Sequence, residues 1–218
     1  KNLARAMQKY DKVVSSLFKD YEFIIINDCS TDRTGEIAES LAKKYKKVRV
    51  FHNKRNMGIG YNYKKGVKLS KKDYYSMLTG EGDSYASSIE NMLKHVGEAD
   101  ILMSYVENPE ARLLYRRIIS GAFVILLNTL FGFHIKYYSG LGVNKTKLLK
   151  KIRINTNSFA YQAEIIIKLL KKGYSYKELP FYIEKERSRM EIFRIKNLIG
   201  MLSAVFRIFF EMNAKNIK

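Results

Sequence analysis

The sequence is poor in several residues that build special frameworks: its 218 residues include one cysteine, two prolines, three histidines and no tryptophan. The single Cys29 cannot form a disulfide within the chain or a cysteine-based zinc site, and this usage favours a reducing compartment. With so little proline and no serine- and glycine-rich tract, no linker divides the chain, whose length suits one sizeable domain. The histidines stand in no catalytic motif, so a serine–histidine–aspartate triad is not predicted.

Acidic residues are also few, since 21 Asp and Glu stand against 40 Lys and Arg and the net charge is +19. Such a charge implies a polyanionic partner: nucleic acid, an anionic membrane surface or a phosphorylated substrate. With 46% hydrophobic and 28% charged residues the composition is that of a globular protein, which excludes disorder. Nucleic acid is disfavoured as the partner because the basic residues are spread along the chain and no nucleic-acid-binding motif is present.

Only one long stretch of the chain is free of formal charge, the 18 residues from Ile118 to Ile135. This length is at the lower limit for a membrane-spanning helix, and the stretch contains Asn128 and His134. It therefore predicts a helix that is buried or lies in a membrane interface, rather than one that crosses the bilayer. The first ten residues lack an apolar core, so no signal peptide is predicted there.

Short β-branched and aromatic runs alternate with amphipathic stretches, which predicts βαβ units and a mostly parallel sheet flanked by helices, the α/β class. Ser30, Thr31 and Asp32 precede the second helix and are expected to cap its N-terminus. Strands are predicted at 21–26, 48–52, 73–78, 100–104 and 174–183. Helices are predicted at 1–19, 33–47, 57–69, 87–96, 112–133, 159–172 and 191–212, with an irregular stretch at 136–144.

Polar clusters follow three of the predicted strands, at residues 27–32, 52–56 and 80–83. In open parallel sheets, ligands bind beyond the carboxyl ends of the strands. Because each cluster follows a strand of the same predicted sheet, we expect the three to converge along one edge. That convergence is the first indication of function.

The clusters contain residue types that suit a phosphorylated ligand. Glu81 and Asp83 flank a glycine, and two carboxylates at this spacing suit a divalent cation that bridges the protein to a diphosphate; a plain acidic turn is the alternative. Asp28 can accept hydrogen bonds from a base or ribose, or it is a turn residue. Arg55 can hold phosphate oxygens in a bidentate manner, or it lies in a solvated loop.

The ordered segments FIIINDCSTDRTGE, NKRNMGIG and MLTGEGDSY together resemble the inverting family 2 glycosyltransferases, which have a GT-A fold. The pattern in that family is a strand, then D-D-x-S-x-D-x-T, then R-N-x-G, then a D-x-D-like metal motif. The later segments RRIISGAF and NSFAYQAE are similar to the polyprenyl-phosphate sugar transferases of the dolichyl-phosphate mannose synthase type. The resemblance implies a nucleotide diphosphate sugar donor, Mg²⁺ or Mn²⁺, and a polyprenyl phosphate acceptor.

For the donor, the resemblance assigns roles residue by residue. Asp28 corresponds to the second Asp of the first motif, which contacts the nucleotide base, while Asn27 replaces the first Asp. Asp32 corresponds to the later Asp of that motif, and Arg55 belongs to R-N-x-G. All three charged residues are thereby expected to bind the nucleotide part of the donor.

For the metal and the diphosphate, the resemblance points to two further segments. Glu81 and Asp83 match the metal motif, with Glu81 in place of its first Asp, and Asp83 is also a catalytic candidate. Tyr85 stands where some members have a Gln ligand. Arg187 and Arg189 are expected to serve the diphosphate, although the Gly and the Ser-Lys pair of the family's R-x-x-G-x-S-K loop are absent from ERSRMEIFR.

For the acceptor, Arg116 and Ser120 resemble the Arg-x-x-x-Ser with which these enzymes hold the lipid phosphate, so both are catalytic candidates. The Arg of the family's G-S-R-Y segment has no counterpart in residues 103–106. The helices at 112–133 and 191–212 are expected to lie on an anionic membrane. The resemblance thus implies a peripheral protein at the cytoplasmic, inner face of the membrane.

Two alternatives to this function stay open at the level of sequence. A family 2 glycosyltransferase acting on a hydroxyl acceptor needs a carboxylate base, for which Glu164 is the nearest candidate. The second alternative is a catalytically inactive relative that binds membranes. A nucleic-acid-binding protein is a third, disfavoured interpretation.

The resemblance covers nearly the whole chain, with residues 1–190 as the GT-A-like domain and 191–218 as an amphipathic helix and tail. Family members begin with a strand that ends in a P-x-Y-N-E-like turn, and Lys1 corresponds to a position just after that turn. We therefore expect a central first strand to be missing from this sequence and the donor site to be incomplete without it.

Overall fold

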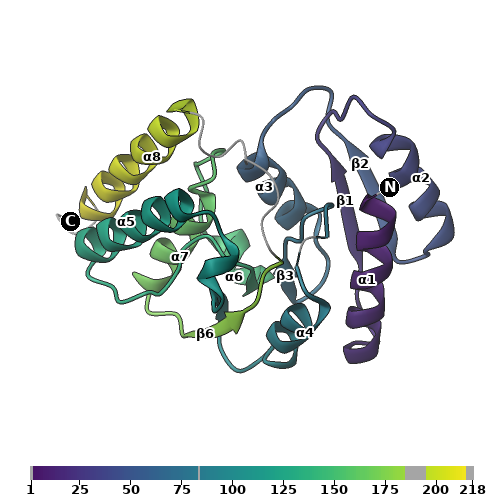
Figure 1. The fold of residues 1–218 in the computed structure, drawn as a ribbon, viewed down its shortest axis with the longest axis horizontal. Coiled ribbons are helices and arrows are strands. Elements are labelled where there is room, and N and C mark those ends of the chain that lie inside the picture. The colour runs from purple at the N-terminus through teal and green to yellow at the C-terminus, as the bar shows by residue number, and fades with distance from the viewer. Residues whose placement is uncertain (1, 83, 185–194, 215–218) are drawn as a thin grey trace.

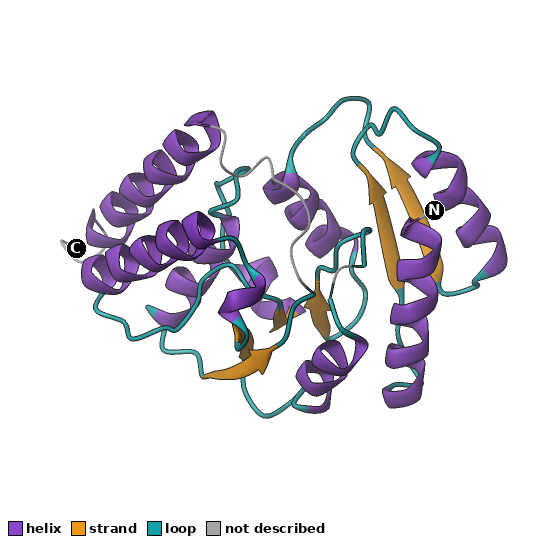
Figure 2. Ribbon diagram, in the orientation of Figure 1, coloured by secondary structure: helices purple, strands orange, loops and turns teal. Residues whose placement is uncertain are grey.

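The computed structural model describes residues 2–82, 84–184 and 195–214, drawn as a ribbon in Figures 1 and 2. The helices are α1 Asn2–Leu17, α2 Thr34–Lys44, α3 Ile59–Leu69, α4 Ala86–Lys94, α5 Leu114–Phe131, α6 Thr146–Lys151, α7 Tyr161–Leu170 and α8 Ile195–Ala214, with a 3-10 turn at Pro109–Ala111. The strands are β1 Phe23–Asn27, β2 Val48–His52, β3 Tyr74–Ser76, β4 Ile101–Val106, β5 Gly142–Lys145 and β6 Tyr176–Phe181.

The strands β1 and β2 form a parallel pair whose register runs from Phe23 opposite Val48 to Asn27 opposite His52. Helices α1 and α2 pack against this pair, as Figure 1 shows. The small core between them is centred on Met7, Leu41 and Val48. Because the register ends at Asn27 and His52, the loops that follow the two strands start side by side.

The other four strands form a second sheet in the order β3-β5-β4-β6. The pair β4 and β6 is parallel, but β5 runs antiparallel to both β3 and β4. The predicted α/β class with helices flanking the sheet is therefore confirmed, while the mostly parallel pairing is corrected to a partly parallel one. The described strands also divide into two sheets, so the carboxyl ends of β1 and β3 do not share one sheet edge.

Strand β5 was not predicted, because residues 136–144 carry no alternating apolar pattern. The strand Gly142–Lys145 has one large apolar side chain, Val143, and is specified by its pairing with β3 and β4. Just before it, a Cβ on Gly140 would stand 2.2 Å from the carbonyl oxygen of Ser104, so glycine is required where the chain approaches the strand. The short helix α6 was missed as well.

The main hydrophobic core lies between the second sheet and the helices α5, α7 and α8. Helix α7 is apolar on almost all sides and buries Ile165, Ile167 and Leu169 nearly completely. Helix α8 contributes Val205 and Ile208 to the same core. The residues predicted as a C-terminal amphipathic helix thus pack directly onto the domain.

Helix α5 is the one helix among the described residues that is long and apolar enough to cross a membrane, by length and composition alone. Only 11% of its residues are buried, namely Leu127 and Phe131 in its last turns. Leu114 and Ile118 in its first turns are 65% and 62% exposed. The expectation of a buried helix is therefore wrong for the first half of α5, and the expectation of an interfacial helix stays a prediction.

Candidate functional site

Asp28 directly follows β1 and anchors the loop that follows β2. Its carboxylate accepts hydrogen bonds from the side-chain amide of Asn53 at 2.7 Å and from the backbone N–H groups of Met57 and Gly58 at 2.8 and 2.9 Å. Burial acts to raise the pKa of Asp28, but these hydrogen bonds favour the charged form and lower the pKa below its ordinary value. The ionised carboxylate of Asp28 therefore fixes the loop 53–58 at this edge of the sheet.

The first two polar clusters meet as the sequence predicts. The side-chain amide nitrogen of Asn27 lies 3.0 Å from Nδ1 of His52, and the carboxamide oxygen of Asn27 accepts the backbone N–H of Ser30 at 3.1 Å. Arg55 is exposed in the loop 53–58, where its side chain faces solvent. Residues from both strand ends are thus available along one edge, beside the ionised Asp28.

The loop from β1 to α2 contains Cys29 in the left-handed region, with φ of 60°, a conformation that non-glycine residues adopt at local cost. Asp32 is exposed and accepts the backbone N–H of Thr34 at 3.0 Å. Hydrogen bonds from the side chain and backbone of Thr34 lower the pKa of Asp32. Because α2 begins only at Thr34, the predicted capping by Ser30 and Thr31 is wrong, and Asp32 alone of the three reaches the helix end.

The third cluster, around Glu81, is held by α1. Gly82 has φ of 70°, and a Cβ there would stand 2.9 Å from the Cβ of Ala6, so glycine is required both by the backbone and by the contact. The ammonium group of Lys9 donates to the carbonyl oxygens of Gly82 and Ser84, the latter at 2.7 Å. The described contacts of this loop are therefore with α1 and, through the bridge between Ser84 and Ile183, with the segment after β6, rather than with Asp28.

Three of the predicted site residues, Glu81, Arg116 and Ser120, line one cavity of about 900 Å³. Its walls come from α1, the loop around Glu81, α5, the segment 137–141, the start of α7 and Met201 of α8. This size suits a ligand of the dimensions of a nucleotide or larger. Asp28, Asp32 and Arg55 are not among the lining residues, so the predicted single site is divided between the cavity and the β1–β2 edge.

On α5, Arg116 and Ser120 face the cavity from the same side, one helical turn apart. The hydroxyl of Ser120 donates to the backbone carbonyl of Arg116 at 2.6 Å. Apolar side chains also line the cavity: Phe123 and Val124 one turn further along α5, and Ile119, Phe159 and Met201. Along α5 the lining therefore passes from polar residues in the first turns to apolar residues further on.

Several cavity residues were not recognised in the sequence as members of the site. Arg5 and Lys9 on α1 and Arg112 just before α5 bring further positive charge to the lining. Their signal in the sequence is weak, because basic residues four positions apart are typical of the solvent face of any amphipathic helix. The packing of α1 against the Glu81 loop places Arg5 and Lys9 at the cavity, and the turn before α5 places Arg112 there.

The described residues of the cavity offer a divalent cation few protein ligands. Glu81 is exposed at the cavity, whereas Asp83, Arg187 and Arg189 lie outside the described residues, so their roles stay predictions. Within the described ranges no three His, Cys, Asp or Glu side chains gather as a metal site. Mg²⁺ fits such a setting, because it is commonly held by one or two carboxylates together with the phosphates of a substrate.

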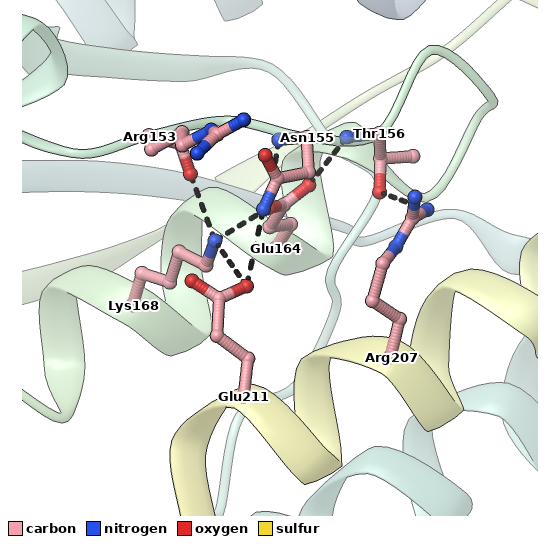
Figure 3. Close-up of polar contacts among 7 residues, drawn as sticks. All are labelled: Arg153, Asn155, Thr156, Glu164, Lys168, Arg207 and Glu211. Atoms are coloured by element: carbon pink, nitrogen blue, oxygen red, sulfur yellow. Dashed lines mark hydrogen bonds and ion pairs between the residues drawn. The ribbon is translucent and has the colours of Figure 1, made fainter. Parts of the chain in front are cut away.

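Glu164, the candidate base for a hydroxyl acceptor, belongs to a buried network of hydrogen bonds and ion pairs (Figure 3). It is fully buried and accepts the backbone N–H groups of Asn155 and Thr156 at 2.9 and 2.8 Å and the ammonium group of Lys168 at 2.6 Å. Lys168 also pairs with Glu211 of α8 at 2.9 Å. Burial acts to raise the pKa of Glu164, but the hydrogen bonds outweigh it and lower the pKa. Glu164 does not line the cavity, so its interpretation as a base is wrong for this geometry.

Residues 8–170 match the family described as Glycosyl transferase family 2. An uncharacterized glycosyltransferase of Bacillus subtilis, EpsJ, is 36% identical over 78 residues, which cover 36% of this chain and 22% of that protein. A cholesterol galactosyltransferase of Borreliella burgdorferi is 36% identical over 87 residues, which cover 40% of this chain and 24% of that protein. The matches span about a quarter of the length of either relative.

Among solved structures, glucosyl-3-phosphoglycerate synthase from Mycobacterium tuberculosis, in complex with Mn²⁺, UDP and glucosyl-3-phosphoglycerate, matches with a TM-score of 0.64 at 13% sequence identity. The match covers 97% of this chain and 76% of that chain. At this identity the likeness is one of fold, and it confirms the GT-A-like α/β architecture.

Proposed function

Because the chain belongs to glycosyl transferase family 2, we propose that it transfers a sugar, with inversion, from a nucleotide diphosphate sugar to a polyprenyl phosphate. The protein acts peripherally at the cytoplasmic, inner face of a membrane. Mg²⁺ or Mn²⁺ is its cofactor, held by Glu81 and Asp83.

The observation that carries the proposal is the two-part lining of the cavity. Arg116 and Ser120 stand at one part, and an arginine fork with a neighbouring hydroxyl suits a phosphate group. The apolar residues of the lining, among them Phe123 one turn further along α5 and Phe159, suit a hydrocarbon chain. A polyprenyl phosphate is a phosphate at the end of such a chain, whereas a small polar acceptor leaves these apolar residues unused.

The outer face of α5 supports the membrane part of the proposal. Leu114, Ile118 and Ile125 are 65%, 62% and 69% exposed, and their spacing of four and seven residues places them on one stripe. Arg116 and Ser120 line the cavity from the other side of the helix. Helix α5 thus separates the cavity from an exposed apolar surface.

Helix α8 has an exposed apolar stripe of its own. It lies beside α5 (Figure 1), with the rings of Phe131 and Phe209 6.1 Å apart. Its Leu202, Phe206 and Phe210 recur every four residues and are 46%, 60% and 67% exposed. Exposed apolar stripes on a protein of charge +19 are typical of helices that lie in the plane of an anionic membrane.

The chemistry requires little from the protein besides positioning and charge. An oxygen of the acceptor phosphate attacks the anomeric carbon in line, a new carbon–oxygen bond forms, and the bond from that carbon to the donor's diphosphate breaks. The electron pair leaves with the nucleoside diphosphate. Because the attacking oxygen is already ionised, no general base is needed, and Arg116 and Ser120 orient it. The divalent cation, when bound, supplies positive charge to the diphosphate leaving group.

Transfer to a hydroxyl acceptor is the alternative within the same family. It requires a base that removes the hydroxyl proton. The candidate Glu164 is committed to Lys168 and to two backbone N–H groups, and its lowered pKa makes it a weak base. Glu164 is therefore not placed to act as that base.

The test is a donor screen on the full-length protein, with UDP- and GDP-sugars, Mg²⁺ or Mn²⁺, and either undecaprenyl phosphate or undecaprenol. We expect sugar transfer to the phosphate only, and its loss in EDTA. The variant Arg116→Ala should lose phosphate transfer far more than donor binding. The matched control is Arg117→Ala, which removes the same charge from an exposed position that does not line the cavity.

Transfer to undecaprenol and not to its phosphate would replace the proposal with the hydroxyl-acceptor alternative. Vesicle binding without turnover of any donor would indicate the inactive relative. Undiminished transfer in EDTA would remove the metal from the proposal, and unchanged acceptor kinetics in Arg116→Ala would remove that residue from the acceptor site.

A further inference from the structure

We propose that Lys64 of α3 and Arg207 of α8 together bind the phosphate headgroup of an anionic phospholipid, at a site separate from the cavity. The inference rests on the membrane part of the proposed function, because it names the class of lipid and the residues that recognise it. Neither Lys64 nor Arg207 is among the residues that line the cavity, so this site is not the one assigned to the acceptor phosphate.

Both cations are attached to neighbouring residues of one loop, 155–158. The ammonium group of Lys64 donates to the side-chain oxygen of Asn157 at 2.6 Å. The Nη2 group of Arg207 donates to the hydroxyl of Thr156 at 3.4 Å (Figure 3). Two positive charges from different helices are therefore held at consecutive residues. Lys64 is half-buried and Arg207 is exposed, so a headgroup can approach the pair from solvent.

The loop that carries the two charges is itself fixed by packing. The backbone N–H of Gly60 in α3 donates to the carbonyl oxygen of Asn157 at 3.1 Å. A Cβ on Gly60 would stand 2.7 Å from the carbonyl oxygen of Thr156, so α3 lies directly against the loop. Thr156 is fully buried, and its backbone N–H donates to the carboxylate of Glu164 at 2.8 Å. The support of the two cations is thus preorganised.

The two charges oppose each other and have no acidic partner. In the part of the chain that the structure describes, neither Lys64 nor Arg207 forms an ion pair, and the carboxylates of the adjoining network, Glu164 and Glu211, pair with Lys168. Burial lowers the pKa of Lys64, and the charge of Arg207 lowers it further against the opposite effect of Glu164. An anion between Lys64 and Arg207 would relieve their repulsion.

The neighbourhood on α8 indicates which anion that is. Arg207 directly follows Phe206, which is 60% exposed and belongs to the apolar stripe with Leu202 and Phe210. Successive residues of a helix point about 100° apart, so Arg207 lies at the border between this stripe and the loop 155–158. On a membrane, apolar side chains enter the acyl region while basic ones at their border reach the headgroups. A phospholipid offers an anion and an apolar region at these two depths, whereas a soluble phosphate leaves the stripe unused.

The test measures binding of the full-length protein to vesicles by sedimentation. The vesicles contain phosphatidylcholine alone, or equal parts of phosphatidylcholine and phosphatidylglycerol. Calorimetry with glycerol 3-phosphate tests the same headgroup chemistry in solution. The proteins are wild type, Lys64→Gln, Arg207→Gln, the double variant and the control Lys68→Gln, which removes an exposed charge one turn further along α3. Thermal unfolding of each variant checks that the fold is retained.

On vesicles with phosphatidylglycerol we expect Lys64→Gln and Arg207→Gln each to bind about tenfold more weakly or worse, the effect of losing a charge-assisted hydrogen bond. Lys68→Gln should lose at most about fivefold, the general attraction of one basic residue. The double variant should lose less than the product of the two single losses, because both cations contact one phosphate. On phosphatidylcholine alone all variants should equal wild type, and glycerol 3-phosphate should bind far more weakly than the vesicles.

Three outcomes would overturn the inference. Losses in Lys64→Gln and Arg207→Gln no larger than that in Lys68→Gln would reduce the pair to general surface charge. A double variant whose loss equals the product of the single losses would show that the two cations do not share a phosphate. Binding of glycerol 3-phosphate as tight as that of the vesicles, and lost in both single variants, would make the ligand a soluble phosphate ester. The donor screen on wild type decides separately whether the proposed function fails.

Discussion

Two regions of the molecule use the same charged residue types in opposite ways. In the buried network of Glu164, Lys168 and Glu211, the two glutamates both pair with one lysine, which is 4% exposed (Figure 3). In the cavity, Glu81 and Arg116 line a space of about 900 Å³. The first region is enclosed by the packing of α7 and α8, whereas the residues of the second line a space that a ligand can fill.

The network also explains how α8 is attached. Lys168 belongs to α7 and Glu211 to α8, and Asn155, whose N–H binds Glu164, donates its side chain to Glu211 at 3.2 Å. The comparison teaches that the sequence neighbourhood of a carboxylate does not decide its role. Its partners decide, and those are visible only in the fold.

The largest effect is expected on stability, from Lys168→Met. Removal of the lysine leaves Glu164 buried and without its cation, and breaking a buried pair in this way costs about 3 to 5 kcal/mol. Urea unfolding followed by circular dichroism measures this free energy. The matched surface control Lys172→Met, at an exposed position one turn on, should stay within about 0.5 kcal/mol of wild type.

The double variant Lys168→Met with Glu164→Gln sharpens the result. Because the second change removes the stranded charge, the double variant should be more stable than Lys168→Met alone. If the double variant loses as much unfolding free energy as the two single variants together, Glu164 and Lys168 do not act as a unit.

The next effect is on activity, from Glu81→Gln. The change removes the described carboxylate of the proposed metal site while keeping the shape of the side chain, so we expect a loss of transfer of about a hundredfold or more. Stability should change little, because Glu81 is exposed. Raising the Mg²⁺ concentration should recover part of the rate. If Glu81→Gln retains wild-type activity, Glu81 is not a ligand of the divalent cation.

Much of the fold could be predicted because it depends on local patterns. The run YEFIII predicts β1, and the apolar residues around EIIIKLL predict α7, since periodicity and β-branching act within a few residues. Strand β5 escaped prediction because Gly142–Lys145 has little apolar pattern of its own and is held by pairing with the distant strands β3 and β4. The division into two sheets escaped for the same reason, as strand order is a property of long-range pairing.

The candidate site shows the same limit. The motifs located Asp28, Glu81 and Arg116, because these residues follow strands or begin a helix. They did not reveal that the carboxylate of Asp28 accepts hydrogen bonds from the backbone of Met57 and Gly58, nor that Arg112 lines the cavity. Side-chain partners 29 or more residues away carry no local signal.

The third effect is on acid stability, from Glu164→Gln. The folded state lowers the pKa of Glu164 below its ordinary value of 4.5, so the ionised carboxylate stabilises the fold at neutral pH. The stabilisation is complete above about pH 4.5 and is lost as the pH falls through the lower, folded pKa. The difference in unfolding free energy between wild type and Glu164→Gln should therefore be largest near pH 7 and shrink toward pH 3. A difference independent of pH would show that Glu164 does not titrate with unfolding.

The smallest effects are expected at the exposed apolar surface of α5 and α8. Phe206 is 60% exposed, so Phe206→Ser should leave the thermal unfolding temperature almost unchanged. On vesicles the ring becomes buried, and its loss should weaken binding to neutral and anionic vesicles alike by roughly tenfold. Sedimentation with vesicles of the two compositions measures both affinities.

Arg117→Ala separates the electrostatic part of membrane binding from the apolar part. One basic residue near an anionic surface contributes about 1 kcal/mol, so this variant should bind anionic vesicles about fivefold more weakly at low salt. The loss should fade as salt rises, because exposed charges are screened, and it should be absent on neutral vesicles. Equal binding of wild type to both vesicle types at every salt concentration would leave only the apolar stripe as a contact. Unchanged binding of Phe206→Ser would instead make the stripe an ordinary exposed surface, and the cavity would then have to receive its acceptor from solution.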